Sequence, residues 1–207
     1  MNISSDVDYG ITWNIFTSNG NEDAFSMIYH GHYDLLYYVG LKYTSDIQVV
    51  EDSIQNVFVN LLKNRTKLNP VINVRGFLLK SFRRQLFLDL KKQKKFSLIG
   101  KVTEAQFDYF NGTKENLYGK DEPDELQRAL KRSLLKLSDK QKEIIYLRYD
   151  CDLTYEEISD ILEISVESCY QSVYRSIKTI KVDIEQMLKK GKNFVLWVMF
   201  HLRKSFC

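Results

Sequence analysis

Proline and glycine are scarce in this sequence, which has 2 prolines and 9 glycines in 207 residues. These residues form most of the tight turns of β-sandwiches and β-barrels, so their scarcity argues against a turn-rich β protein. A hydrophobic content of 44% still allows well-packed cores. The composition therefore favours an all-α protein, long enough for one large or two small domains.

Cysteine is also scarce. Cys151, Cys169 and Cys207 form no C-x-x-C pair and no even set of disulfides, which indicates a reducing compartment. His30 and His32 lie two residues apart, on different faces of a helix, and have no cysteine or acidic partner at ligand spacing, so no metal site is expected. The sequence contains no Gly-rich phosphate loop and no nucleophile–base signature. An enzyme is therefore the least favoured class, and we expect neither a cofactor nor a small-molecule substrate.

The sequence also lacks a signal peptide, because its first twenty residues have neither a basic start nor an apolar core. This indicates a cytoplasmic protein. The apolar run FVLWVMF at 194–200 is too short to span a bilayer. Three roles stay open for it: packing on the second domain, binding a partner, or touching a membrane surface. The net charge is only +3, so contact with a polyanion requires a local cluster of basic residues.

What the sequence does contain is helical periodicity in two blocks. Residues 1–20 are polar with scattered aromatics and predict a loosely held arm. The blocks 21–95 and 123–186 predict two small helical domains. The intervening residues 96–122 lose the periodicity and predict a flexible linker, and 187–207 form a hydrophobic C-terminal tail. The expected fold class is therefore all-α, with two domains and a helix-turn-helix at the end of the second.

The first block predicts three helices. They begin near Asn21, at Ser45 with Gln48 as its capping partner, and at about Arg75. A loop containing several asparagines separates the last two. In the third helix, four apolar residues recur every four positions and predict a buried stripe: Leu78, Phe82, Leu86 and Leu90.

That third helix also carries a basic cluster. From 75 to 95 there are eight basic residues against one acid, Asp89, a local charge of +7. Basic side chains on one helix face neutralise phosphates and release counterions. Aromatic residues among them, Phe77 and Phe87, are suited to stacking on unpaired bases. A solvated basic helix with no ligand is the alternative.

The second block ends in the stretch TYEEISDILEISVESCYQSVYRSIK from Thr154 to Lys178. Before it, Pro123 fits the first turn of a helix, and Ser138 with Gln141 predicts the start of the next. Thr154 with Glu157 has the capping-box pattern, and Ser165 can cap a second helix after a very short turn. The helical spacing points Val166, Cys169, Val173, Ile177 and Ile180 inward.

This layout is typical of a helix-turn-helix, whose second helix enters the DNA major groove. The expected outer face of that helix is polar and aromatic, and it comprises Glu167, Ser168, Tyr170, Gln171, Tyr174, Arg175 and Lys178. An ordinary helical hairpin is the alternative for this stretch alone.

Over residues 22–185 the chain resembles the small two-domain bacterial sigma factors of the extracytoplasmic-function group. The resemblance rests on AFSMIYHGHYDLLY, VVEDSIQNVFVNLL, NVRGFLLKSFRRQLFLDLKK and the long segment from Leu137 to Lys178, in this order and spacing. The third piece is most similar to the branch that serves outer-membrane uptake systems and answers to a membrane-bound anti-sigma factor. The resemblance implies core RNA polymerase, promoter DNA and such an anti-sigma factor as partners.

The resemblance also implies roles for particular residues. The pattern acidic-x-x-Gln-x-x-Phe would dock on polymerase through Asp52, Gln55 and Phe58. The loop at 67–73 would capture a base extruded from the −10 strand. The −10 surface would comprise Asn69, Asn73, Phe77, Lys80, Arg83, Arg84, Phe87, Lys91 and Lys92. The −35 element would be read by the seven outer-face residues of 165–178, with Gln171 suited to adenine and Arg175 to guanine or phosphate.

Three features of the sequence depart from the family pattern. Glu163 stands where the turn usually has glycine. The outer face has Tyr170, Gln171 and Tyr174 where many relatives have basic or small residues. The common Arg-Asn pair near Arg84 is Arg-Gln here. The promoter sequence therefore does not transfer from relatives.

Two further classes compete with a sigma factor. A stand-alone helix-turn-helix regulator would bind DNA without polymerase, but it needs neither the basic-aromatic helix nor the polar face at Asp52 and Gln55. A helical adaptor would use its helix-turn-helix to bind proteins only. Salt-dependent DNA binding by residues 123–185 would count against an adaptor.

Overall fold

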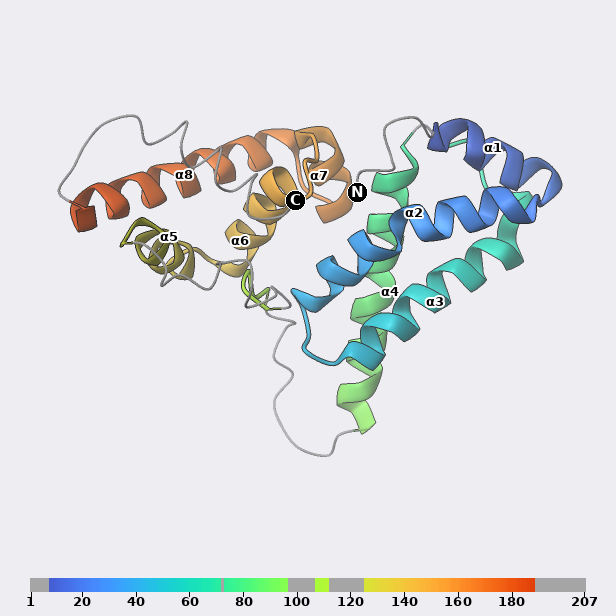
Figure 1. Cartoon of the computed structure of the whole chain (residues 1–207), viewed down its shortest axis with the longest axis horizontal. Coiled ribbons are helices and arrows are strands. Elements are labelled where there is room, and N and C mark those ends of the chain that lie inside the picture. Colours follow the sequence, from blue (N-terminus) through green and yellow to red (C-terminus); the bar gives the residue numbers. More distant parts are fainter. Residues whose placement is uncertain (1–7, 72, 97–106, 112–124, 189–207) are drawn as a thin grey trace. The chain divides into compact units, whose positions relative to one another are not determined.

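The structure, a computed structural model, describes residues 8–71, 73–96, 107–111 and 125–188 (Figure 1). The described residues form eight α-helices, a short 3₁₀ turn and a π-helical turn. They divide into two compact units, Met1–Ala105 and Gln106–Cys207. The predicted all-α, two-domain organisation is therefore confirmed for the part of the chain that the structure describes.

Four helices build the first unit. They are α1 (Tyr9–Asn19), α2 (Glu22–Leu41), α3 (Ile47–Asn64) and α4 (Val74–Phe96), and the 3₁₀ turn η1 (Arg65–Lys67) follows α3. In the first unit α2 packs against α1 and α3, and α4 packs against α3 and α2 (Figure 1). The core contains the apolar faces of all four helices, including Phe16, Ile28, Leu36, Ile54, Leu78, Phe82 and Leu86. Burying each such side chain contributes about 1.5–3 kcal/mol.

The crossing of α2 with its neighbours depends on a glycine. A Cβ atom at Gly40 would lie 2.6 Å from Cγ1 of Val50 and 2.9 Å from Cζ of Phe82. These distances are shorter than van der Waals contact, so only glycine allows α3 and α4 to approach α2 this closely. The predicted stripe on α4 is thus buried at Leu78, Phe82 and Leu86, while Leu90 is half-buried.

The prediction of a loosely held arm at 1–20 is wrong for residues 8–20. Asp8 caps α1 through its carboxylate, which accepts from the backbone N–H of Gly10 and Ile11. Gly20 ends the helix at a φ of 71°, the left-handed conformation that glycine adopts readily. Trp13 is 0% exposed, because α1 docks on the core through Trp13 and Phe16. The start of α3 also differs from expectation, since Asp46 rather than Ser45 is its N-cap, accepting from the N–H of Val49.

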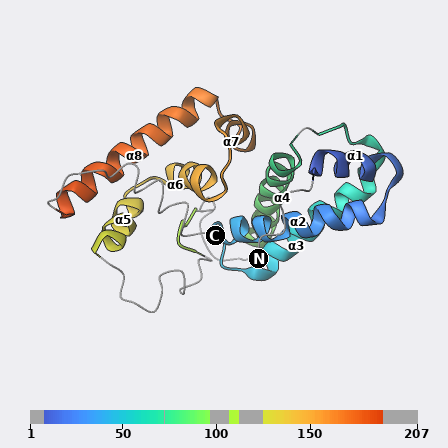
Figure 2. The same cartoon turned by 45° about the horizontal axis from the view of Figure 1, so that its top comes forward.

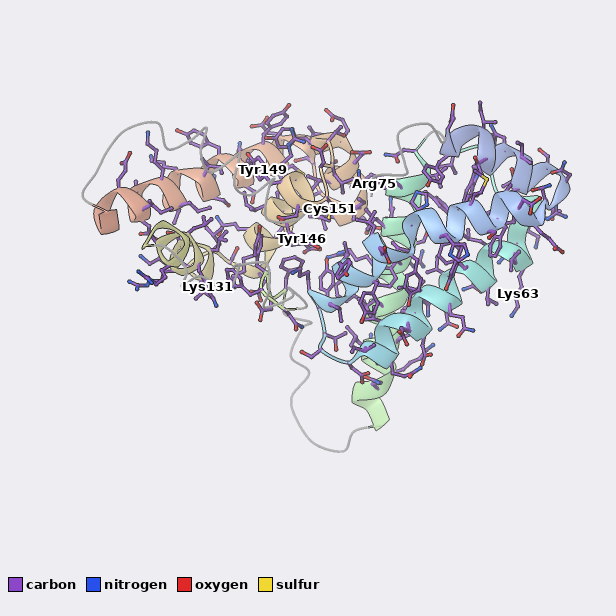
Figure 3. The ribbon with its side chains drawn as sticks, in the orientation of Figure 1. Lys63, Arg75, Lys131, Tyr146, Tyr149 and Cys151 are labelled. Atoms are coloured by element: carbon purple, nitrogen blue, oxygen red, sulfur yellow. The ribbon has the colours of Figure 1, made fainter. Side chains whose placement is uncertain are left out.

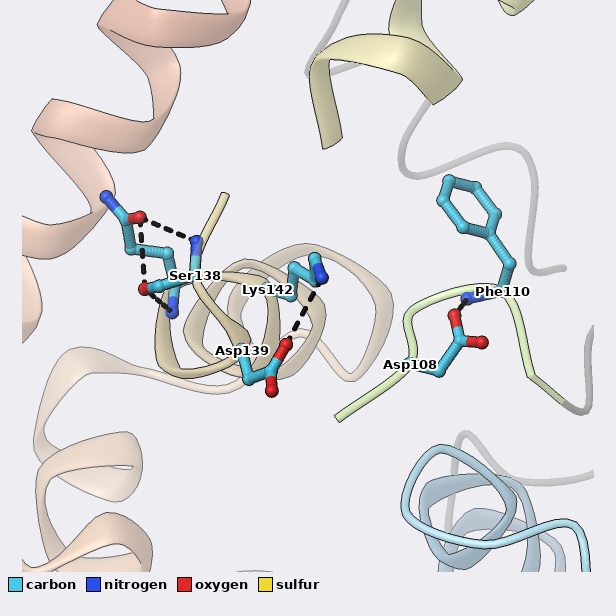
Figure 4. A network of polar contacts seen from close by, with 6 residues as sticks. Asp108, Phe110, Ser138, Asp139 and Lys142 are labelled. Carbon is cyan, nitrogen blue, oxygen red and sulfur yellow. Dashed lines mark hydrogen bonds and ion pairs between the residues drawn. The ribbon is translucent and has the colours of Figure 1, made fainter. Parts of the chain in front are cut away.

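The second unit contains α5 (Glu125–Leu135), α6 (Asp139–Ile145), the π-helical turn η3 (Tyr146–Asp150), α7 (Tyr155–Leu162) and α8 (Val166–Leu188). The long helix α8 packs against α5, α6 and α7 (Figure 2). The predicted capping box at the start of α6 is confirmed. The N–H of Gln141 donates to Oγ of Ser138, and the N–H of Ser138 donates to Oε1 of Gln141 (Figure 4).

Part of the predicted flexible linker is bound to the second unit. Phe107 and Tyr109 are buried, with ring centroids 5.7 and 5.8 Å from that of Tyr146. The hydroxyl of Tyr109 donates to Oδ2 of Asp150 at 2.7 Å. Figure 3 labels Tyr146, where η3 begins, and Lys131 on α5, whose Nζ lies over the ring of Phe110. Aromatic burial thus attaches 107–111 to this unit. Of the rest of the predicted linker and tail, Phe96 ends α4 and residues 187–188 end α8, while 97–106, 112–122 and 189–207 lie outside the described residues.

The described helices contain no apolar stretch long enough to cross a membrane. In the described ranges we also find no group of three histidine, cysteine, aspartate or glutamate side chains that could hold a metal ion.

Candidate nucleic-acid interface

The helix pair α7–α8 begins with a strong cap. Thr154 accepts through Oγ1 from the N–H of Glu157, and Glu157 accepts through Oε2 from the N–H of Thr154. This reciprocal pair is the predicted capping box, and it satisfies two backbone donors that the first turn leaves unpaired. Ile158 and Ile161 then turn into the core.

The turn between α7 and α8 is closed without glycine. Glu163 adopts φ 54° and ψ 46°, and its N–H donates to the carbonyl of Ser159. Ser159 also donates from Oγ to the carbonyl of Ile164 at 2.6 Å. The left-handed conformation costs a non-glycine residue roughly 1–2 kcal/mol. These local hydrogen bonds offset part of that cost. The turn therefore keeps its left-handed conformation with glutamate, in place of glycine, at position 163.

Helix α8 starts at the predicted cap. Oγ of Ser165 accepts from the N–H of Ser168 at 3.1 Å. Cys169, Val173 and Ile180 are buried as predicted, while Val166 and Ile177 are half-buried. Burial raises the pKa of the Cys169 thiol, so it is a core residue and not a reactive thiolate.

The outward prediction for α8 holds at every position. One exposed face carries all seven predicted residues: Glu167, Ser168, Tyr170, Gln171, Tyr174, Arg175 and Lys178. Tyr174 is 69% exposed, which is unusual for a large aromatic side chain. A polar face interrupted by exposed rings has both the hydrogen-bonding groups and the apolar groups that contact base edges.

Three of these side chains form a hydrogen-bonded row along the helix. Nε2 of Gln171 donates to Oε1 of Glu167 at 2.9 Å. NH2 of Arg175 donates to Oε1 of Gln171 at 3.4 Å. The spacing of four residues makes these neighbours on one face. The row orients the amide of Gln171 and holds the guanidinium of Arg175 along the outer surface of α8.

A second contact reaches across to α7. The ring of Tyr170 stacks on that of Tyr155, and the guanidinium carbon of Arg148 lies 5.1 Å from the Tyr155 ring centroid. Arg148 also donates from NH1 to the carbonyl of Leu153 at 2.7 Å. The sequence pattern did not indicate Tyr155 or Arg148 as site residues. Their contact depends on the π-helical turn η3, which brings the guanidinium of Arg148 to the ring of Tyr155 on α7.

The basic helix α4 keeps its one acid away from its basic face, which comprises Lys80, Arg84 and Lys91. Asp89 turns to α3, where Oγ of Ser53 donates to its Oδ2 at 3.0 Å. Burial alone would raise the pKa of Asp89, but hydrogen bonds from Gln85, Ser53 and Lys92 outweigh it and lower that pKa. The carboxylate therefore ties α4 to α3.

The predicted −10 residues divide into two groups. Asn69, Arg84, Lys91 and Lys92 are exposed. The other five are half-buried: Asn73, Phe77, Lys80, Arg83 and Phe87. Within α4 the exposed cations are therefore the ones placed to meet phosphate. One of them, Lys92, also forms an ion pair with Asp89, with Nζ 3.4 Å from Oδ1.

Three of the half-buried residues have structural roles. The Phe77 ring lies 5.2 Å from that of Trp13. The Phe87 ring lies 5.2 Å from that of Tyr43, with the guanidinium of Arg83 4.6 Å from its centroid. Neither ring is free to insert between bases without leaving these contacts. The expectation that both rings stack on bases did not account for this packing.

The predicted polymerase-docking residues also differ among themselves. Asp52 and Gln55 are exposed on α3, and Nε2 of Gln48 donates to Oδ1 of Asp52 at 2.9 Å. Phe58 is 3% exposed, with ring contacts to Phe25 and Tyr29. Its assignment as a surface contact is corrected, because its ring holds α3 against α2.

Of the two histidines on α2, His32 lies in the core of the first unit and His30 lies on its surface. His32 is buried and donates from Nδ1 to the carbonyl of Ile28 at 2.8 Å, while His30 is exposed. Burial lowers the pKa of His32, the hydrogen bond to Ile28 opposes this, and the charge of Arg75 lowers it further. His32 is thus neutral in the folded protein near neutral pH.

Comparison with known proteins finds a family match for the part of the chain that contains this helix pair. Residues 127–180 match the family described as Sigma-70, region 4, and this match includes α7 and the entire outer face of α8. A search of curated proteins finds no match.

Two solved structures share the fold. One is the structure of CnrH in complex with the cytosolic domain of CnrY, with 16% identity and a TM-score of 0.56 over 86% of this chain and 97% of that chain. The other is the sigma factor RpoE in complex with the anti-sigma factor NepR from Bartonella quintana, with 17% identity and a TM-score of 0.51 over 81% of this chain and 98% of that chain. At these identities the likeness concerns the fold. The predicted resemblance to sigma factors is confirmed by the family match in the second unit and by the fold over most of the chain.

Proposed function

We propose that this chain, whose residues 127–180 are a sigma-70 region 4 domain, is a sigma factor of the extracytoplasmic-function group that directs RNA polymerase to specific promoters. It would act as a specificity subunit without catalysis or cofactor of its own. The observation that carries the proposal is the exposed outer face of α8, where all seven predicted residues gather inside the matched domain. In a helix-turn-helix this is the face that enters the major groove.

The first unit supports a second DNA contact. Arg84 and Lys91 are exposed on α4, and Asp89 is turned away to α3. Such a face neutralises phosphates of a melting −10 element. Two binding surfaces on separate units let one protein bind two sites on the same DNA. Once one unit is bound to its site, the effective concentration of the other unit at the second site is raised.

Polymerase docking is proposed for the exposed edge of α3. Asp52 and Gln55 present a carboxylate and an amide there, while the buried Phe58 holds α3 in place. Since promoter DNA and polymerase share the cytoplasm, the proposal places the chain in that compartment. Both similar structures are complexes with a second protein, and one of those partners is named as an anti-sigma factor. We extend this to the present chain and propose a membrane-bound anti-sigma factor as its regulator.

The decisive experiment is co-purification of the full chain with core RNA polymerase, followed by run-off transcription on a library of genomic fragments. Binding together with new transcription start sites supports the proposal, and the start sites give the −35 and −10 sequences. Core polymerase without the chain is the control for background initiation.

A stand-alone helix-turn-helix regulator is the second candidate, and the same outer face of α8 favours it. It predicts DNA binding without polymerase binding. Retained sequence-specific DNA affinity in a chain that never co-purifies with polymerase would decide for this candidate.

A further inference from the structure

The N-terminal helix α1 contacts the loop between α3 and α4 at two points. The indole Nε1–H of Trp13 donates to the backbone carbonyl of Asn69 at 3.3 Å. NH1 of Arg65 donates to the backbone carbonyl of Thr17 at 3.3 Å. The paired residues are 56 and 48 positions apart in sequence, so these contacts exist only in the folded unit.

Trp13 reaches the loop from a buried position. Its ring lies 6.1 Å from that of Phe16 on the same helix and 5.2 Å from that of Phe77 on α4. An indole has a single polar atom, its N–H, and a buried indole usually directs that atom to an acceptor. Packing against Phe77 therefore aims the N–H at the carbonyl of Asn69.

Arg65 joins the start of the loop to the end of α1. A Cβ atom at Gly20 would lie 2.9 Å from Cζ of Arg65, so the guanidinium packs directly over the glycine that ends the helix. A cation at this place is favoured by the negative end of the helix dipole and by the unpaired carbonyls of the last turn. Glycine at position 20 thus allows both the left-handed turn and the approach of Arg65.

The far end of the loop is held by α4. Oδ1 of Asn73 accepts from the N–H of Gly76 at 2.9 Å and thereby takes part in starting α4. The backbone at Asn69 is held by α1, while the Asn69 side chain is exposed. Asn69 is therefore a residue with a held backbone and a solvent-facing amide, which is a suitable arrangement for reading a base edge.

We propose that α1 is a brace that holds the loop at 65–69 in the shape that presents Asn69 to the extruded base of the −10 strand. Trp13 and Arg65 are its positioning residues. The proposal rests on the proposed function and on the base capture that the resemblance to sigma factors implies for the loop at 67–73. A pocket that receives an unstacked base must offset an unstacking cost of a few kcal/mol, so a preformed loop favours opening. Loss of the brace slows promoter opening and leaves promoter binding through α8 unchanged.

The test uses holoenzyme assembled from core polymerase and the full chain, on a promoter recovered from the run-off experiment with 2-aminopurine at the extruded position. Fluorescence of this base rises when it leaves the stack and gives the opening rate at saturating holoenzyme. Arg65→Lys keeps the charge but loses the planar fork, and Trp13→Phe keeps an aromatic ring but loses the N–H. Ile15→Ala is the matched control, because Ile15 lies on the exposed side of α1.

We expect the opening rate to fall about fivefold in Arg65→Lys, the effect of losing one hydrogen bond, with unchanged affinity for a −35 duplex. Trp13→Phe should slow opening at least as much, and Ile15→Ala should match wild type. Wild-type opening rates in both brace variants overturn the proposal, as does a parallel loss of −35 affinity and thermal stability in Arg65→Lys. If wild-type holoenzyme opens no promoter, the proposed function fails and the brace fails with it.

Discussion

The ring of Tyr170 on α8 stacks on the ring of Tyr155 on α7, with centroids 3.8 Å apart and planes inclined by 27°. Aromatic pairs of this kind contribute about 0.5–1.5 kcal/mol beyond the area they bury. The pair links the outer face of the second helix of the helix-turn-helix to the helix that precedes it. One edge of the proposed DNA-reading face is therefore held in place before DNA arrives.

Removing the stack should weaken DNA reading by this face. We expect Tyr155→Ala to lower affinity for the −35 duplex by up to about tenfold, because Tyr170 loses its support. Fluorescence anisotropy with the full chain measures this, and Tyr155→Phe, which keeps the ring, is the matched control. Equal affinities for all three proteins would show that Tyr170 needs no support from α7.

Arg175 is proposed to read a base or bind phosphate. If its contact with a guanine edge is bidentate, Arg175→Ala should weaken −35 recognition by about 1–3 kcal/mol and relax preference at one position. The measurement is affinity for a set of duplexes with single base changes. Lys178→Ala serves as the comparison, since a phosphate contact weakens all duplexes alike. An unchanged sequence preference in Arg175→Ala would exclude base reading by this residue.

Lys91 is exposed on the basic face of α4 and is expected to meet a phosphate. Lys91→Ala should lower affinity for −10 DNA uniformly and reduce the slope of log affinity against log salt by about one unit. Salt titration of the full chain on single-stranded −10 DNA measures this slope. Lys63→Ala, an exposed lysine at the end of α3, is the control (Figure 3). An identical slope in Lys91→Ala would mean that Lys91 contacts no phosphate.

Asp52 and Gln55 form the proposed docking edge of α3. Because both are exposed, replacing both by alanine should abolish co-purification with core polymerase while circular dichroism and the thermal midpoint stay unchanged. Asn60→Ala, an exposed change on the same helix, should leave binding intact. Normal holoenzyme formation by the double variant would remove this edge from the interface.

His32 makes the stability of the first unit depend on pH. Its pKa is lowered from 6.5 on folding, so the unfolded chain binds a proton more readily than the folded one. The free energy of unfolding should therefore fall as pH falls from about 6.5 toward the folded pKa and stay level above 6.5. Denaturant titrations across this range measure the fall. His32→Gln should reduce it, whereas His30→Gln should not, since His30 is exposed.

Local sequence predicted the helix-turn-helix closely. Capping at Thr154 with Glu157 and at Ser165 involves residues three apart, and the outer face of α8 follows from a spacing of 3.6 residues per turn. The same signals existed for α1, where Asp8 is a typical N-cap and Gly20 a typical residue after a helix. The helix was not predicted because its buried apolar residues are only Trp13 and Phe16, which is too few to show helical periodicity.

The roles of several aromatic residues could not be predicted in this way. Phe58 and Phe77 belong to expected functional patterns, yet their rings lie against Tyr29 and Trp13. Tyr109 falls in an expected linker, yet its hydroxyl donates to Asp150. In each case the partner is distant in sequence, and periodicity contains no information about which distant side chain fills a gap in the core.

The sequence by itself determined the all-α class, the two helical blocks and the exposed face of α8, because helix periodicity and capping depend on residues at most four positions apart. Tertiary structure alone decided that α1 docks, that 107–111 packs on the second unit, and which of the predicted contact residues are exposed. Those outcomes depend on burial and on hydrogen bonds between distant segments, such as that from Trp13 to Asn69. Such contacts form only when the whole unit folds.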